Sequence, residues 1–360
     1  MIVTAGMFLM GLLLLVAGGD LLVRGASKLA QTFGISPLVI GLTVVAFGTS
    51  APELAVSVNS VLDNQIDLAL GNVVGSNIFN VLFILGISAL ITPLIVDRQL
   101  IRQEVPVMFG ASVLLSLMAI DGHISFVNGL ILFALLIGYI VVTIWQSRRQ
   151  RIEPAKSADQ AADEVADIKR WRNHWLTQAA FIGLGLALLV IGSNWLVAAA
   201  VTVAKTLGVS EAIIGLTIVA AGTSLPEVAT SVMAAIRGER DIAVGNVVGS
   251  NIFNILGVLG ISSLFASNGL VVAPAILYFD LPFMLVVAFA CMPVFFTGNL
   301  IARWEGGLFL AAYLAYLGYL ILATVQHDQL ASYSVAMGFF VGPLVLLTIL
   351  VIACRESRQR

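Results

Sequence analysis

A glutamate that follows two hydroxyl residues and a proline occurs twice in this chain, each time inside strongly apolar sequence. The two copies are Gly48–Glu53 and Gly222–Glu227. Carboxylate, hydroxyl and backbone carbonyl oxygens are the ligands that hard cations prefer. Because hydrocarbon penalises ionisable groups, a carboxylate that recurs in apolar sequence points to a functional site. The pattern therefore predicts that Glu53 and Glu227 bind a cation.

The proline in each copy predicts a break in the helix that carries it. Pro52 lacks a backbone N–H, and its ring clashes with the carbonyl of Gly48, four residues earlier. A glycine at that position lowers the resistance to unwinding. We expect Pro52 to begin a second half-helix, Glu53 to project from its first turn, and the freed carbonyls to line a cavity. Gly222 and Pro226 repeat this arrangement in the second copy.

The similarity continues beyond the proline motifs. Gly41–Glu53 matches Gly215–Glu227, and Gly71–Asn80 matches Gly245–Asn254 at a constant offset of about 174 residues. Over the whole aligned stretch, roughly 28 of 46 positions are identical. The chain therefore contains an internal repeat that is larger than a single motif.

The second segment of each repeat has two interpretations. Its glycines have Gly-x-x-x-Gly spacing, which is typical of close helix packing, and packing is the favoured interpretation for them. Four asparagines are likewise assigned to helix-to-helix hydrogen bonds: Asn72, Asn77, Asn246 and Asn251. In contrast, Asn80 lies four residues after Ser76 on one helix face, as Asn254 does after Ser250. We expect these two asparagines to line the cation site.

The composition is that of a helical membrane protein with several spans. Hydrophobic residues make up 59% of the chain and charged residues 11%, whereas a soluble domain is typically about 25% charged. Apolar runs of about 20 residues are long enough to cross a bilayer, and helices satisfy their own backbone there. We predict eleven helices, at 5–27, 36–61, 67–91, 104–120, 124–146, 176–203, 211–236, 241–264, 274–297, 303–325 and 334–354.

One polar stretch divides the chain into two halves. Residues 149–173 mix both charge signs and are predicted to form a solvated linker between a first five-helix repeat, 1–148, and a second, 174–326. Residues 327–360 add an extra transmembrane helix and a basic tail that have no counterpart in the repeat.

The distribution of Lys and Arg predicts the orientation, because short basic loops favour the cytoplasm. If the linker is cytoplasmic, about 17 basic residues lie inside and one, Lys205, lies outside. The N-terminus is then outside and the C-terminus inside, and the two repeats enter the membrane from opposite sides. Such inverted repeats are common in secondary transporters, whose substrate sites lie near the midplane.

We therefore predict an all-α integral membrane protein. Its ten-helix core consists of two inverted five-helix repeats in which helices 2 and 7 are broken, and an eleventh helix follows. A simpler interpretation is that Pro52 and Pro226 only kink their helices, with the glutamates protonated or bonded to nearby hydroxyls. Two copies in inverted orientation favour a shared site, with a charge of about −2 that suits one divalent ion or several monovalent ions.

The two repeats differ at positions beside the predicted site. Phe47 corresponds to Ala221, and Phe83 corresponds to Gly257, whereas the residues predicted to line the site match. We expect any asymmetry between the two faces of the site to arise from packing around it and not from its charges.

At these residues the chain resembles the cation/calcium exchanger superfamily, in the sodium/calcium exchanger branch with prokaryotic members. The signature of that family, G-[TS]-S-x-P-[ED] followed by G-N-x-x-G-S-N/A-x-x-[ND], is present in full in both repeats. The resemblance implies a ten-helix core. It also implies four ion sites between helices 2, 3, 7 and 8 that hold Na⁺ or Ca²⁺ in alternation.

The resemblance also implies ligand roles by position. Glu53 and Glu227 would be the main Ca²⁺ ligands, joined by the backbone carbonyls of Thr49 and Thr223. The other implied ligands, which complete the flanking Na⁺ sites or line the middle, are Ser50, Ser224, Ser76, Ser250, the carbonyls of Ala46 and Ala220, and Asn80 and Asn254. Some relatives, including the potassium-dependent branch, have Asp at the position of Asn254, so the amide argues against K⁺ co-transport.

We therefore expect a secondary active antiporter, not an enzyme, in the plasma (inner) membrane. It would admit Na⁺ and export Ca²⁺ by alternating access, with these ions and the lipid bilayer as partners and with no cofactor and no nucleic acid. Exchange of H⁺ for Ca²⁺ or another divalent cation is the alternative, because Glu53 and Glu227 could carry protons. A cation channel is less favoured, because inverted repeats around one closed site are typical of carriers.

Overall fold

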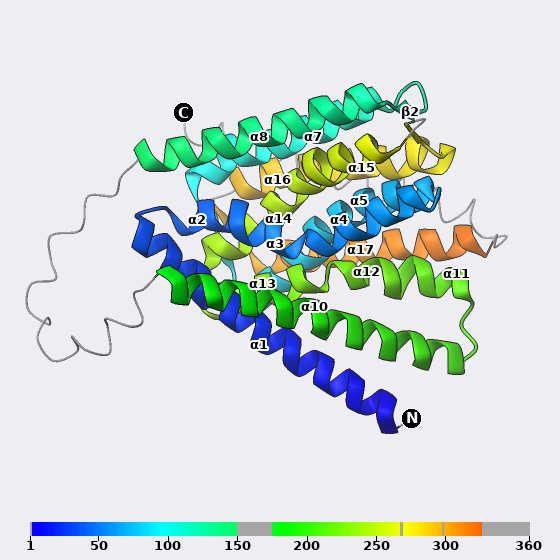
Figure 1. Cartoon of the computed structure of the whole chain (residues 1–360), viewed down its shortest axis with the longest axis horizontal. Helices are drawn as coiled ribbons and strands as arrows, with labels where there is room; N and C mark the ends of the chain where they lie inside the picture. The colour runs from blue at the N-terminus through cyan, green and yellow to red at the C-terminus, as the bar shows by residue number, and fades with distance from the viewer. Residues whose placement is uncertain (1, 150–174, 267–268, 297–298, 326–360) are drawn as a thin grey trace, which may run out of the picture.

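The computed structural model of this chain describes residues 2–149, 175–266, 269–296 and 299–325, which are almost entirely helical (Figure 1). Within these residues, eight helices are long and apolar enough to cross a membrane, and two bent pairs of helices supply up to two more spans. The prediction of a ten-helix core with two broken helices is thus confirmed. The predicted helix at 334–354, and the predicted linker apart from Arg149, lie outside the described residues.

The spans follow the predicted order, and most of their ends differ from the predicted ones by a few residues. The π-helical segments are labelled η. The first half contains α1 (Ile2–Phe33), α2 (Pro37–Ile40), η1 (Gly41–Val45), α3 (Ala46–Thr49), α4 (Ala51–Leu62), α5 (Ile66–Phe79), η2 (Asn80–Leu85), α6 (Gly86–Ile91), η3 (Leu100–Glu104), α7 (Val105–Met118) and α8 (Phe126–Arg149). The second half contains α10 (Trp175–Thr206), α11 (Glu211–Ile214), η4 (Gly215–Val219), α12 (Ala220–Thr223), α13 (Leu225–Ile236), α14 (Arg240–Phe253), η5 (Asn254–Leu259), α15 (Gly260–Phe265), η6 (Ile276–Asp280), α16 (Leu281–Phe296) and α17 (Arg303–Thr324).

Two short antiparallel sheets mark the two ends of the bundle. Strand β1 (Leu94–Ile95) pairs with β4 (Leu300–Ile301), and β2 (His123–Ile124) pairs with β3 (Leu270–Val271). Each sheet takes one strand from each half, so the halves are joined at both ends. We refer to these as the β1–β4 end and the β2–β3 end. Helix α1 runs from the β2–β3 end to the β1–β4 end, and α10 runs the opposite way (Figure 1).

The helices that carry the repeated motifs form the centre of the bundle. All residues of α14 from Ile242 onward, and all of η5, are buried. In contrast, α1, α8 and α10 expose many large apolar side chains. An exposed apolar surface on long helices suits contact with lipid, so these helices form the membrane-facing periphery.

The described residues contain six π-helical segments, three in each half at repeat-related positions. Segments η1 and η4 precede the broken helices, η2 and η5 begin at Asn80 and Asn254, and η3 and η6 begin α7 and α16. A π turn inserts one residue and redirects the side chains around it, and such turns are frequent at functional sites. The apolar periodicity of the sequence did not predict them.

Helices α1 and α10 cross in close contact through glycines. A Cβ atom on Gly18 would lie 2.8 Å from the carbonyl oxygen of Gly185, and one on Gly11 would lie 2.8 Å from that of Gly192. Small residues allow two membrane helices to approach this closely, and the gain is in van der Waals packing. The two long helices therefore contact each other as well as the central bundle.

We predict that Gly18→Ala lowers the melting temperature of the purified protein in detergent. The added methyl group would overlap backbone atoms of α10, and overpacking of this kind destabilises proteins by about 1–3 kcal/mol. Gly6→Ala is the matched control, because Gly6 lies in the same helix and nothing lies within 4 Å of a Cβ placed there. Equal melting temperatures for the two variants would contradict the close crossing.

Candidate cation site

Both predicted helix breaks are present, and each is a single residue long. Ser50 separates α3 from α4 with φ −83° and ψ 7°, and Ser224 separates α12 from α13 with φ −88° and ψ 5°. The half-helices meet at bends of 42° and 59°. Pro52 and Pro226 lie in the first turn of the second half-helix, as predicted. The same first turns present Glu53 and Glu227.

The glycines of the motif act differently from the expectation. Gly48 and Gly222 are themselves helical, two residues before the breaks. A Cβ on Gly48 would lie 2.6 Å from Leu186 Cδ1, and one on Gly222 would lie 2.5 Å from Val197 Cγ2. These glycines therefore allow α10 to approach the broken helices, and the unwinding itself occurs at the serines.

The two glutamates are fully buried, and each is bonded to the other repeat. The hydroxyl of Ser224 donates to Glu53 Oε1 at 2.8 Å, and the hydroxyl of Ser50 donates to Glu227 Oε1 at 3.0 Å. Ser224 Oγ also lies 3.1 Å from Ser76 Oγ. Both glutamate side chains have no exposed surface. The two motifs, which are far apart in the sequence, thus meet at one place.

Asn72 and Asn246 hold this arrangement from the neighbouring helices. Asn72 Nδ2 donates to the backbone carbonyl of Glu53 at 3.3 Å and to Ser57 Oγ at 3.0 Å, while its Oδ1 accepts from Thr223 at 3.3 Å. Asn246 makes the repeat-related bonds in the other half of the site. The predicted role of these two residues in helix-to-helix hydrogen bonding is confirmed.

Asn77 and Asn251 orient the two asparagines that were predicted to line the site. Asn80 Nδ2 donates to Asn251 Oδ1 at 3.0 Å, and Asn254 Nδ2 donates to Asn77 Oδ1 at 3.1 Å. Asn77 and Asn251 in turn each donate to the other's backbone carbonyl, at 3.4 and 3.3 Å. Both NH₂ groups of Asn80 and Asn254 are thereby engaged, so their carbonyl oxygens remain as acceptors.

Four buried side-chain oxygens at this place have no hydrogen-bond partner among the described residues. They are Oε2 of Glu53, Oε2 of Glu227, Oδ1 of Asn80 and Oδ1 of Asn254. Because an unpaired buried polar atom is costly, a group of unpaired oxygens that includes two carboxylate oxygens suits a bound cation.

The other predicted ligands lie around this group. Ser50 and Thr49 are fully buried, and the Ala46 carbonyl accepts from the backbone N–H of Ser50 at 3.0 Å. The Ala220 carbonyl accepts from the hydroxyl of Thr223 at 3.3 Å. The Ala46 carbonyl also lies 3.4 Å from the hydroxyl of Thr49. The ligand roles themselves stay predictions.

One cavity reaches predicted ligands of the site from the β2–β3 end. A cavity of about 480 Å³ extends from Asp67 and Thr324, at the β2–β3 end, to Asn72, Ser76 and Thr223. We refer to it as the inner cavity, because it extends to residues of the predicted site; the name does not refer to a side of the membrane. Thr223 is half-buried, whereas its repeat mate Thr49 has no exposed surface.

Each half also contains a carboxylate–tyrosine pair that the sequence pattern did not predict. The hydroxyl of Tyr139 donates to Glu104 Oε2 at 2.8 Å, and the hydroxyl of Tyr316 donates to Asp280 Oδ1 at 2.9 Å. Glu104 and Asp280 are the last residues of the repeat-related segments η3 and η6. An acidic residue in each fourth helix was the available signal, but this part of the repeat has little sequence identity.

These features define a class of protein: a multi-pass membrane carrier with inverted repeats and a buried polar site between them. A comparison with known families agrees with this class. The family model described as "Sodium/calcium exchanger protein" matches residues 3–145 and 177–322. The chain belongs to this family. It is therefore a multi-pass membrane antiporter of the cation/calcium type, and such exchangers transport ions instead of catalysing a chemical reaction.

Individual relatives span most of the chain. The inner membrane protein YrbG of Escherichia coli is 40% identical over 73% of this chain and 80% of its own length. The sodium/calcium exchanger MaX1 of Methanosarcina acetivorans is 33% identical over 86% of this chain and 96% of its own. A solved structure of the sodium-calcium exchanger NCX_Mj, soaked with Na⁺ and Sr²⁺, superposes with a TM-score of 0.74 at 32% identity. It covers 88% of this chain and 98% of that one.

We predict that Asn251→Ala destabilises the protein by about 1–3 kcal/mol, because the Asn80 amide loses its acceptor and stays buried. Thermal unfolding in detergent measures the change. Asn59→Ala is the control, since Asn59 is an exposed residue of α4. If the melting temperature of Asn251→Ala equalled that of Asn59→Ala, the asparagine network would not contribute to stability.

Proposed function

We propose that this chain exchanges Na⁺ for Ca²⁺ through one site that contains Glu53 and Glu227. The observation that carries the proposal is the group of unpartnered oxygens on Glu53, Glu227, Asn80 and Asn254. Two carboxylate and two amide oxygens, with hydroxyls and carbonyls beside them, form a donor set of hard oxygen ligands. Such a set suits Ca²⁺, and the same oxygens suit Na⁺.

Charge balance supports a coupled exchange. Two carboxylates carry about −2, so one Ca²⁺ neutralises the site. If three Na⁺ replace it, as the family resemblance implies, about one net positive charge moves per cycle. That charge is worth ~2.3 kcal/mol per 100 mV, so an inside-negative membrane potential would help Na⁺ entry to drive Ca²⁺ export.

We propose that the β1–β4 end faces the cytoplasm, with the N-terminus outside and the C-terminus inside. Basic residues gather at that end, where α1 ends, the β1–η3 and α13–α14 turns lie, and α17 begins: Arg24, Lys28, Arg98, Arg102, Arg237, Arg240 and Arg303. Lys205 lies at the opposite end of α10. A basic end is typical of the cytoplasmic face. The inner cavity then opens to the outside, in the state that accepts external Na⁺ and releases Ca²⁺.

In the proposed cycle, α1 and α10 move across the central bundle and open the site to each face in turn. The two repeats, residues 1–148 and 174–326, would each contribute one side of the pathway. The close α1–α10 crossing through glycines supports movement of these helices as a pair. Helices α5 and α14, which lie deep in the bundle, would hold the site itself in place.

Proton-coupled Ca²⁺ exchange is the alternative. The second repeated segments place the amides Asn80 and Asn254, and not carboxylates, beside the glutamates. A neutral amide does not titrate, so fewer groups are available to carry protons. This observation favours Na⁺ over H⁺ as the coupling ion.

Ca²⁺ uptake into proteoliposomes loaded with Na⁺ tests the coupling. We expect uptake to require the outward Na⁺ gradient, to respond to membrane potential, and to be unaffected by K⁺. A pH gradient alone should not drive it. Uptake that ignored Na⁺ and followed the pH gradient would instead establish proton exchange.

We predict that Glu53→Gln and Glu227→Gln each abolish exchange and also abolish the rise in melting temperature that Ca²⁺ causes. Ligand at 100 times its Kd stabilises a protein by about 2.7 kcal/mol, which makes thermal unfolding a binding assay independent of transport. Asp63→Asn is the control, because Asp63 is exposed in the turn after α4. Full activity in either glutamine variant would remove that residue from the site.

A further inference from the structure

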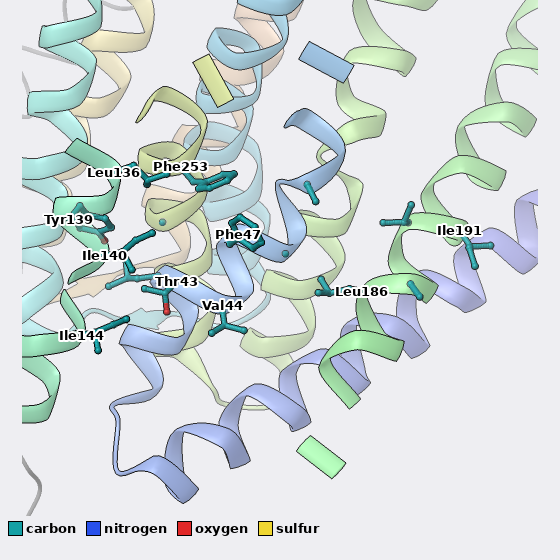
Figure 2. A pocket seen from close by; sticks show the side chains of 16 residues that line it. Thr43, Val44, Phe47, Leu136, Tyr139, Ile140, Ile144, Leu186, Ile191 and Phe253 are labelled. Atoms are coloured by element: carbon teal, nitrogen blue, oxygen red, sulfur yellow. The ribbon is translucent and has the colours of Figure 1, made fainter. Parts of the chain in front are cut away.

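The two halves of the molecule contain repeat-related spaces beside the site, and only one of them reaches it. The inner cavity lies against α5, η4, α12 and α17 and is lined by Gly75, Phe79 and Ala221. A second cavity of about 770 Å³ lies against α3, α8, α10 and α14 and is lined by the repeat mates Gly249, Phe253 and Phe47 (Figure 2). We refer to it as the outer groove, because none of the predicted oxygen ligands lines it.

Direct packing of the first broken helix against α14 separates the outer groove from the site. A Cβ on Gly249 would lie 2.6 Å from the carbonyl oxygen of Leu42, and one on Gly245 would lie 3.0 Å from that of Leu38. No atom outside the helix's own backbone lies within 4 Å of a Cβ placed on their repeat mates, Gly75 and Gly71. The first broken helix is therefore in contact with α14 at the β1–β4 side. The repeat-related glycine surface of α5 has no such contact at the β2–β3 side.

Aromatic contacts follow the same asymmetry. At the closed side, the rings of Phe47 and Phe253 meet edge to face, with centroids 5.1 Å apart and planes at 80° (Figure 2). At the open side the position of Phe47 is occupied by Ala221, which has no ring. Phe79, the mate of Phe253, instead stacks on Phe83 with centroids 4.7 Å apart.

The second difference between the repeats explains which partner each phenylalanine takes. Phe83 is replaced by Gly257 in the second repeat, and a Cβ on Gly257 would lie 2.9 Å from Phe253 Cε2. Phe253 therefore occupies the space that a side chain at 257 would need. From there it contacts Phe47. Phe79 also meets Tyr313 edge to face, with ring centroids 5.2 Å apart.

We propose that Phe47 and Phe253 are gating residues of the exchanger: their contact holds α3 against α14 and keeps the cytoplasmic access path closed. The absence of a ring at Ala221 leaves the opposite path without this closure. The pair touches no transported ion and acts by positioning the first broken helix. The proposal rests on the proposed function and orientation, and it adds a built-in preference for the state open to the outside.

The test compares the Ca²⁺ concentration for half-maximal exchange at each face of the membrane in proteoliposomes. In Phe47→Ala we expect the ratio of the cytoplasmic to the extracellular value to fall about 2- to 10-fold. Losing an aromatic pair of this kind shifts an equilibrium by about that factor, and apparent affinity at each face follows the population of the state open to it. Phe253→Ala should have the same effect, and the double variant should add little to either.

Phe126→Ala is the matched control, because Phe126 at the start of α8 is 53% exposed and Phe47 is 57% exposed, whereas of these two described residues only Phe47 contacts another ring. If Phe47→Ala does not fold, Phe47→Leu keeps apolar bulk while removing the ring, and the ratio should shift in the same direction. An unchanged ratio would contradict the proposed gating role. Fully additive effects of Phe47→Ala and Phe253→Ala would contradict it as well. Absence of Na⁺-driven exchange in the unaltered protein would overturn the proposed function instead.

Discussion

Two carboxylates buried in the middle of a membrane protein constrain everything around them. Neither Glu53 nor Glu227 has exposed surface, and each accepts a hydrogen bond from a serine of the other repeat. A buried charge without partners is strongly unfavourable. The fold meets this requirement by bringing two broken helices together, so that each break supplies a hydroxyl to the opposite glutamate. One oxygen of each carboxylate still has no partner in the described residues, and in our account a transported cation supplies it.

Asparagines around the two glutamates form the next layer of hydrogen bonds. Asn72 and Asn246 fasten the backbone of each glutamate to the neighbouring helix. Asn77 and Asn251 occupy the NH₂ groups of Asn80 and Asn254 and leave their oxygens free. The hydrogen bonds among Asn77, Asn80, Asn251 and Asn254 all join one repeat to the other. The site is therefore a property of the two halves together, and neither half alone contains it.

Much of this could be predicted from the sequence, because an inverted repeat carries strong physical signals. Pro52 and Pro226 indicated the breaks, the apolar lengths indicated the spans, and the repeated asparagines indicated the bonds between helices. Other features depend on contacts that periodicity does not reveal. Gly48 looked like a point of unwinding because its packing partner, Leu186, lies far away in the sequence.

The carboxylate–tyrosine pairs were not predicted, for a related reason. Glu104 and Tyr139 lie on separate helices, and the offset between the repeats changes from 174 residues at Gly86 and Gly260 to 176 at Leu100 and Ile276. The differences at Phe47 and Gly257 were visible in the sequence, but their consequence was not. The structure shows that Phe47 supplies a ring that contacts Phe253. It also shows that Gly257 leaves the space that the Phe253 ring occupies.

A nearly symmetric site inside asymmetric packing has a direct functional meaning. The residues predicted to line the site match between the repeats, so in our proposal the ions meet the same chemistry from either face. The packing around the site does not match: helix contacts close one side, and a cavity opens the other. In such a design the site sets which ions bind, while the surrounding side chains set which face the site prefers.

The central claim is that Glu53 and Glu227 form one site for a divalent cation. Anomalous diffraction from crystals of this protein soaked with Sr²⁺, a heavy substitute for Ca²⁺, tests it most directly. We expect a strong anomalous peak between the two carboxylates, within coordination distance of an oxygen from each. A peak that contacted only one glutamate, or that lay away from both in an ordered structure, would contradict it.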